Sequence, residues 1–128
     1  MLDQHEEDVL LYQHIGKLFY AIASADGTIR NEEILGLEKM IKKYWMADQH
    51  KPNASLIYDG FNDQLMKKTD PETCFNDFME YRKSSPHKFT EELRSAIVKS
   101  AHEIAASFSN KNKSELIFLA KLSIDLRS

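Results

Sequence analysis

The chain has 128 residues, of which 42% are hydrophobic and 29% are charged, and its formal net charge at pH 7 is −3. This length and composition are typical of one globular domain, so we expect residues 1–128 to form a single domain. The acidic balance argues against a nucleic-acid-binding protein, and the single cysteine, Cys74, excludes an intramolecular disulfide and a thiolate metal cluster.

The first predicted helix runs from about Gln4 to Ala25. Gly27 supplies the backbone conformation in which a helix commonly ends. A second helix is predicted to begin near Arg30 or Asn31, and Gly36 within it indicates close packing against a neighbour. In the first helix the apolar residues recur at spacings of three and four, which predicts one buried stripe. That stripe consists of Leu11, Ile15, Leu18, Ile22 and Ala25, widened by Tyr12 and Phe19.

Pro52 is predicted to end the second helix, because proline disrupts the interior of a helix. A third helix is then expected over about Ala54 to Lys68. The sequence TDPE at residues 69–72 is a strong helix-start signal, with Asp70 as the N-cap and proline at the first helical position. The fourth helix is expected to bury Cys74 as an inert thiol.

Thr90 is predicted to cap a fifth helix, and a sixth is predicted to begin at Ser114 after a polar turn. No segment alternates apolar and polar residues with a period of two, so no strand is expected. The predicted fold class is therefore all-α, a compact bundle of about six helices.

Two segments of the chain resemble each other. Residues 22–37 read IASADGTIRNEEILGL, residues 104–119 read IAASFSNKNKSELIFL, and Ile, Ala, Glu and Leu recur in register. The match predicts two helix–loop–helix units related by a degenerate internal repeat and packed together. The shared period of all amphipathic helices is the alternative explanation.

Residues 21–41, AIASADGTIRNEEILGLEKMI, resemble the signature of the tellurite-resistance TerB family, also found as the central domain of certain membrane-anchored DnaJ-like chaperones. The resemblance rests on Ala25-Asp26-Gly27, on Ile29 and on the carboxylate pair Glu32-Glu33. It implies an all-helical bundle, a role in metal or oxyanion stress responses and divalent-cation binding through the acidic loop. The sequence departs from the family pattern at Arg30, where the family often has Ser or Thr.

The first loop therefore has two readings. Asp26, Glu32 and Glu33 offer the oxygen ligands that hard cations prefer. Alternatively, Asp26 makes the turn, and Glu32 and Glu33 stabilise the first turn of the next helix through its dipole. We expect any divalent cation (calcium, magnesium or manganese) to bind once, weakly, at these three carboxylates. The second loop carries Phe108 and two lysines instead, which disfavours a second site.

Two classes of function remain open from the sequence. One is a small TerB-like cation-binding or stress-response domain, and the other is a protein-interaction domain with an unidentified partner and no metal. No nucleophile motif or phosphate-binding loop occurs, so we expect no enzymatic activity. Aromatic pairs such as Tyr44-Trp45 fit either the core or a groove for a partner. No apolar run approaches the ~20 residues of a membrane span, and the N-terminus lacks the features of a signal peptide, so we expect a cytoplasmic protein.

Overall fold

The computed structural model of the chain describes residues 4–25, 29, 31–45 and 51–107. All regular structure within these residues is helical, which confirms the predicted all-α class for this part of the chain. The helices are α1 (Gln4–Ala23), α2 (Asn31–Trp45), α3 (Lys51–Lys67), α4 (Pro71–Ser84), the short 3-10 helix η2 (Pro86–Lys88) and α5 (Glu91–Ser107). The predicted sixth helix and most of the second copy of the repeat lie outside the described residues.

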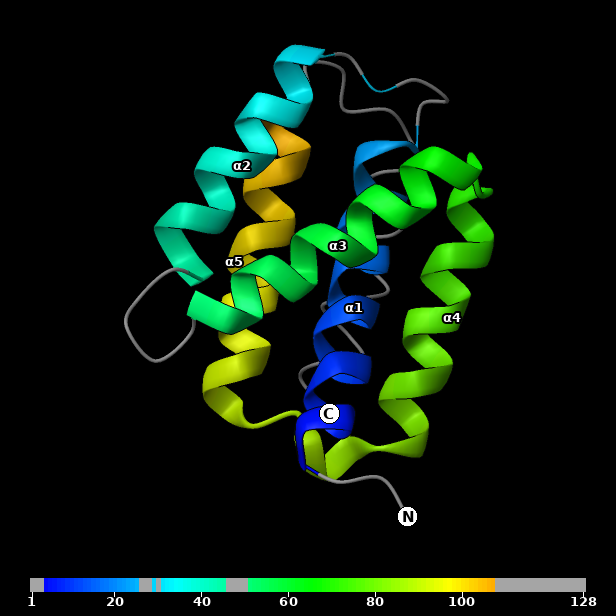
Figure 1. Cartoon of the computed structure of the whole chain (residues 1–128), viewed down its shortest axis with the longest axis vertical. Helices are drawn as coiled ribbons and strands as arrows, with labels where there is room; N and C mark the ends of the chain where they lie inside the picture. Colours follow the sequence, from blue (N-terminus) through cyan, green and yellow to red (C-terminus); the bar gives the residue numbers. More distant parts are fainter. Residues whose placement is uncertain (1–3, 26–28, 30, 46–50, 108–128) are drawn as a thin grey trace.

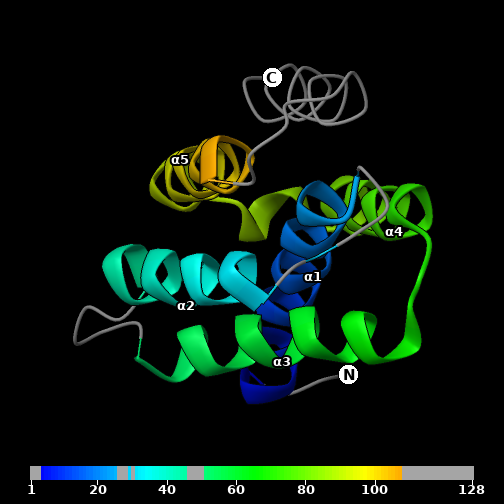
Figure 2. The ribbon, with the colours of Figure 1, turned by 90° about the horizontal axis from the view of Figure 1, so that it is seen from above.

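Helix α1 lies at the centre of the bundle. Figure 2 shows it between α2 and α3 on one side and α4 and α5 on the other. Leu18, Phe19, Ala21, Ile22 and Ala23 are all 0% exposed, although they point in different directions around the helix. The predicted stripe residues Leu11, Ile15, Leu18 and Ile22 are buried, as is Phe19, and Ala25 is half-buried. Over residues 18–23 the burial extends beyond the stripe to all sides of the helix, as expected of a segment that is apolar all around.

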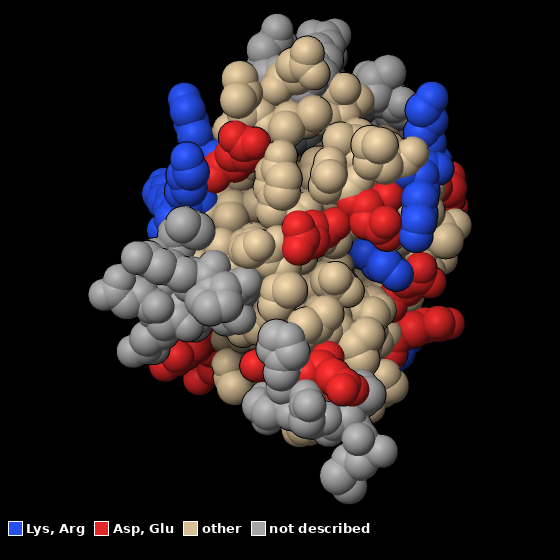
Figure 3. Space-filling view, viewed as in Figure 1, with Lys and Arg blue, Asp and Glu red and all other residues tan. Residues whose placement is uncertain are grey.

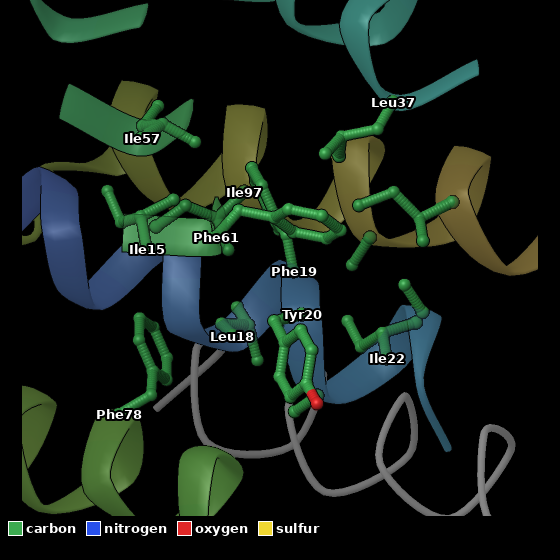
Figure 4. Packing of buried hydrophobic residues seen from close by; sticks show 14 of the residues in the cluster. Ile15, Leu18, Phe19, Tyr20, Ile22, Leu37, Ile57, Phe61, Phe78 and Ile97 are labelled. Atoms are coloured by element: carbon green, nitrogen blue, oxygen red, sulfur yellow. The ribbon is translucent and has the colours of Figure 1, made fainter. Parts of the chain in front are cut away.

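The core receives side chains from all five α-helices (Figure 4). Phe19 of α1 lies among residues from the surrounding helices, and no labelled side chain of this cluster is more than 5% exposed. Burying such aliphatic and aromatic side chains is the dominant favourable contribution to folding. The labelled residues are Ile15, Leu18, Phe19, Tyr20, Ile22, Leu37, Ile57, Phe61, Phe78 and Ile97.

Two glycines permit the close crossing of α1 and α3. A Cβ atom added at Gly16 would lie 2.7 Å from the Phe61 backbone nitrogen, and closer still to the Ile57 carbonyl oxygen. A Cβ atom added at Gly60 would lie 2.9 Å from the Gln13 Cα atom. Backbone atoms cannot rotate aside as a flexible side chain can, so both positions require glycine. The α1–α3 interface is also the most extensive between any two described helices.

Two predictions about α2 and α3 are wrong. Gly36 does not mark a close contact, because a Cβ atom there would meet nothing within 4 Å. Helix α3 begins at Lys51 and not near Ala54, so Pro52 lies in its first turn and does not simply end the preceding helix. Proline is tolerated in a first helical turn because the N–H it lacks would have no partner within the helix.

The turn between α3 and α4 is short and closed by hydrogen bonds at both ends. Lys68 has a φ of 54°, the left-handed conformation that often ends a helix. Its amide donates to the Leu65 carbonyl at 3.3 Å, and the Thr69 amide donates to the Gln64 carbonyl at 3.2 Å. Asp70 then accepts from the Thr73 amide at 3.1 Å, which confirms the predicted N-cap of α4.

Helix α4 packs on α1 through a stacked pair of rings and a buried thiol. The rings of His14 and Tyr81 lie 4.2 Å apart, with an angle of 9° between their planes. The His14 Nδ1 atom is 2.7 Å from the Leu10 carbonyl oxygen, which can only accept, so the neutral ring carries its hydrogen on Nδ1. Cys74 is fully buried as predicted, and burial raises the pKa of its thiol to about 11.

We predict opposite effects for two glycine-to-alanine substitutions. Gly16→Ala should lower the free energy of unfolding by about 1–3 kcal/mol, because α1 and α3 must separate to admit the methyl group. Gly36→Ala should raise it by about 0.5–1 kcal/mol, because the open site accepts the methyl group and alanine favours the helix. Urea denaturation measures both changes. Equal effects of the two substitutions would contradict the close crossing.

We also predict that stability depends on pH through His14. Burial lowers the pKa of His14 below its ordinary value, although the Leu10 carbonyl acts in the opposite direction. The folded protein therefore binds this proton more weakly than the unfolded chain. The resulting stabilisation is complete above pH ~6.5 and is lost as the pH falls through the folded-state pKa.

His14→Phe, which keeps an aromatic ring on Tyr81, should reduce the loss of stability below pH ~6.5. Thermal denaturation at a series of pH values measures this loss. The control is His87→Gln, because His87 is exposed on η2 and should leave the pH dependence unchanged. The same pH dependence in His14→Phe and in the wild type would contradict the assignment.

Candidate functional site

The three carboxylates predicted to bind a cation are not brought together by the described residues. Asp26 and the side chain of Glu32 lie outside them, as do Arg30, Phe108 and both lysines of the second loop. Glu33 lies in the first turn of α2, where its side chain is half-buried. Among the described side chains, no group of three or more His, Cys, Asp or Glu residues is placed to hold a metal.

A hollow lies elsewhere, between α1, the C-terminal end of α2, and α5. We call it the aromatic pocket. Its volume is about 430 Å³, within the ~300–1,000 Å³ typical of ligand sites. Figure 1 shows that the first residues of α1 and α5 lie at the same end of the bundle. The pocket is lined by Glu7, Asp8, Leu11, Tyr12, Tyr44, Trp45, His87, Lys88, Thr90, Glu92, Leu93 and Ala96.

The floor of the pocket is fixed by Trp45, which is only 2% exposed. Its indole Nε1 donates to the Ser100 hydroxyl at 3.0 Å, which anchors the last residue of α2 on α5. The Tyr12 ring meets the indole edge to face, with centroids 6.3 Å apart and an interplanar angle of 78°. Because its polar N–H is already bonded, the tryptophan contributes an apolar surface held in one orientation.

Tyr44 is held beside this floor by a charged group on α5. Its hydroxyl donates to Glu103 Oε1 at 2.8 Å, and Lys43 Nζ donates to the same oxygen at 2.9 Å. The Lys43 hydrogen bond, together with that of Tyr44, lowers the pKa of Glu103. The same contacts raise the pKa of Lys43, so both groups stay charged near neutral pH. The Tyr44 ring is therefore kept at the pocket wall.

Carboxylates from two helices border the pocket. Glu7 belongs to the first turn of α1 and Glu92 to the first turn of α5. Asp8 lies close enough to Tyr12 to act on its hydroxyl, whose pKa is raised by burial and further by this carboxylate. Lys88 is the basic residue of the lining, but its Nζ lies 3.5 Å from the Tyr81 hydroxyl and 5.7 Å from the centre of that ring.

A second hollow adjoins the aromatic pocket along α5. We call it the α5 hollow, and its volume is about 450 Å³. Tyr44, Glu92 and Ala96 line both hollows, so the two lie side by side. The combined site follows α5 over Glu91–Lys99, a helical length of about 12 Å. The remaining lining residues of the α5 hollow are Glu91, Ser95 and Lys99.

Only part of this site is predictable from the sequence. The pair Tyr44-Trp45 fits either the core or a groove, and in the structure Trp45 is buried whereas Tyr44 is half-buried at the pocket wall. The acidic residues in the first turns of α1 and α5 were the sequence feature from which the acidic border of the pocket could have been predicted. Acidic residues there are also expected from the helix dipole alone, so the sequence could not show that the two turns meet.

Charge on the opposite part of the surface is mixed. Figure 3 shows Lys and Arg side chains at two separate edges of the face that α3 crosses, with Asp and Glu between them. The described residues visible on this face therefore form no continuous basic surface of the kind that nucleic acid requires.

Comparison of the chain with protein-family models, with curated proteins and with solved structures found no match. None of the described helices combines the length and the apolar character needed to cross a bilayer. Fold and site together define an all-helical domain with an aromatic-floored, acid-bordered pocket.

Proposed function

We propose that this chain is a non-catalytic interaction domain that holds a segment of another protein in the aromatic pocket and the α5 hollow. The observation that carries the proposal is the rigid aromatic floor: Tyr12 and Trp45 are fixed against each other, and Ser100 fixes Trp45. Aromatic side chains held in one orientation contribute contact area at a low cost in conformational entropy, and Tyr12 and Tyr44 keep part of their surface exposed for such contact. The elongated shape along α5 suits a polypeptide segment better than a compact small molecule.

The polar groups of the lining support binding and not catalysis. A nucleophile and its base must lie within hydrogen-bond reach of each other. The Thr90 hydroxyl instead accepts from the Leu93 amide at 3.1 Å, which is the predicted helix cap of α5. His87 is exposed on η2. The lining thus offers surfaces and charges, with the Thr90 hydroxyl engaged in holding the helix.

The proposal predicts that blocking the pocket abolishes binding. Ala96 lines both hollows, so Ala96→Arg should fill the space and weaken the binding of selected peptides by about tenfold or more. Peptides selected from a displayed library against the wild-type domain provide the ligands, and fluorescence anisotropy measures their affinity. Circular dichroism verifies that the variant remains helical.

The matched control is Ala106→Arg, the same substitution at an exposed position of the same helix. It should bind the selected peptides as the wild type does. Equal binding by both arginine variants, or failure to select any peptide that competes for the pocket, would refute the proposed function.

A second candidate is the TerB-like function that the sequence resemblance implies, with the sixth helix and the repeat completing the bundle. It is supported by the position of the helix ends: α1 ends at Ala23 and α2 begins at Asn31. Glu32 and Glu33 thus occupy the first turn of α2, close in sequence to Asp26. In this function one weakly bound divalent cation at the three carboxylates would serve a metal or oxyanion stress response.

Titration with calcium, magnesium and manganese tests this candidate. We expect at most one site, with a dissociation constant of about 0.1–1 mM or weaker, because few oxygen ligands are present and Arg30 is nearby. Asp26→Asn and Glu33→Gln should each weaken binding, as measured by calorimetry or by NMR shifts. Equal binding in the wild type and both variants would show that the cation, if bound, lies elsewhere.

A further inference from the structure

The site is acidic overall, and this restricts what it can hold. Among the described residues, four carboxylates line the two hollows, from Glu7, Asp8, Glu91 and Glu92, against the two ammonium groups of Lys88 and Lys99. The Lys88 ammonium lies over the Tyr81 ring of α4. The ion pairs Lys17–Asp77, Lys43–Glu103 and Lys67–Asp63 do not involve Glu7, Glu91 or Glu92.

The carboxylates of the site come from two helices. Glu7 and Asp8 belong to the start of α1, and Glu91 and Glu92 belong to the start of α5. Leu11 and Leu93 add apolar atoms to the same lining. A ligand in the pocket therefore meets negative charge from both helices as well as an apolar surface.

Resting on the proposed function, we infer that the bound segment is basic and amphipathic, with lysine or arginine side chains beside the carboxylates of α1 and α5 and an apolar side chain on the Tyr12–Trp45 floor. Long basic side chains suit this border, because their methylene stems cover apolar surface while their charged ends reach the carboxylates. Complementary charge also excludes acidic segments, since like charges brought together disfavour binding.

Trp45 is the single tryptophan of the chain and lines the pocket, so its fluorescence reports binding at this place. The probes are three synthetic peptides of equal length: one of lysine and leucine, one with glutamate in place of lysine, and one with serine in place of leucine. We expect the lysine–leucine peptide to shift the Trp45 emission and to bind about tenfold or more tightly than either of the others. Its affinity should fall as salt is added, because salt screens exposed charges.

Two double variants are compared, and each removes two negative charges. Glu7→Gln with Glu92→Gln should weaken the lysine–leucine peptide by about two- to fivefold per residue, as is typical of exposed ion pairs. Glu72→Gln with Glu80→Gln, on exposed positions of α4, should leave its affinity unchanged. Both variants retain the aromatic floor.

Three outcomes overturn the inference. Tighter or equal binding of the glutamate peptide shows that charge does not select the ligand, and equal binding of the lysine–serine peptide shows that the floor is not used. Failure of every peptide to bind, as measured by fluorescence anisotropy, also rejects a basic amphipathic ligand. In each case the proposed function is still tested by the peptides selected from the library and by their binding to Ala96→Arg and Ala106→Arg. That test is independent because the library contains peptides of any charge.

Discussion

The close crossing of α1 and α3 is the constraint on which the remaining structure depends. Gly16 and Gly60 let the two backbones approach to a distance at which any side chain would collide with the opposite main chain. Interiors are packed too densely to absorb such a collision without moving a helix. With α3 fixed across α1, the other helices can only cover the sides of α1 that remain, and residues 18–23 of α1 are buried on every side.

The outer helices are held by a different kind of contact. Trp45 and Ser100 join α2 to α5, Glu103 joins them again, and Tyr58 of α3 donates to Glu38 of α2 at 3.0 Å. These hydrogen bonds are directional, so they set the rotation of α2 about its own axis more narrowly than apolar packing alone does. These hydrogen bonds therefore also set the orientation of the pocket floor, because Trp45 is the last residue of α2.

The sequence predicted what is encoded locally and missed what depends on the partner helix. Asp70 and Thr90 were identified as helix caps because a cap is recognised by residues within one turn of itself. Gly36 was wrongly predicted to mark a close contact, because a sequence does not show which side of a helix has no neighbour. The stripe of α1 was too narrow for the same reason: spacing gives the face toward one neighbour, whereas α1 has neighbours all around.

The aromatic pocket was beyond prediction on similar grounds. Its floor was recognisable as an aromatic pair, but Tyr12 and Trp45 are far apart in the chain and meet only because α2 returns toward the start of α1. The carboxylates of the first loop were easy to see, since three acidic residues close together in sequence form a local pattern. Because Asp26 and the side chain of Glu32 lie outside the described residues, the cation site stays a prediction.

The buried thiol of Cys74 gives the molecule an internal reporter of its own motions. With no exposed surface and its pKa raised to about 11, the native thiol presents almost no reactive thiolate near neutral pH. A thiol reagent can react only in those moments when α4 separates from α1 and Gln64, whose side-chain oxygen lies 3.5 Å from the sulfur. The rate of labelling therefore measures the free energy of that opening, and distinguishes partial release of α4 from unfolding of the whole bundle.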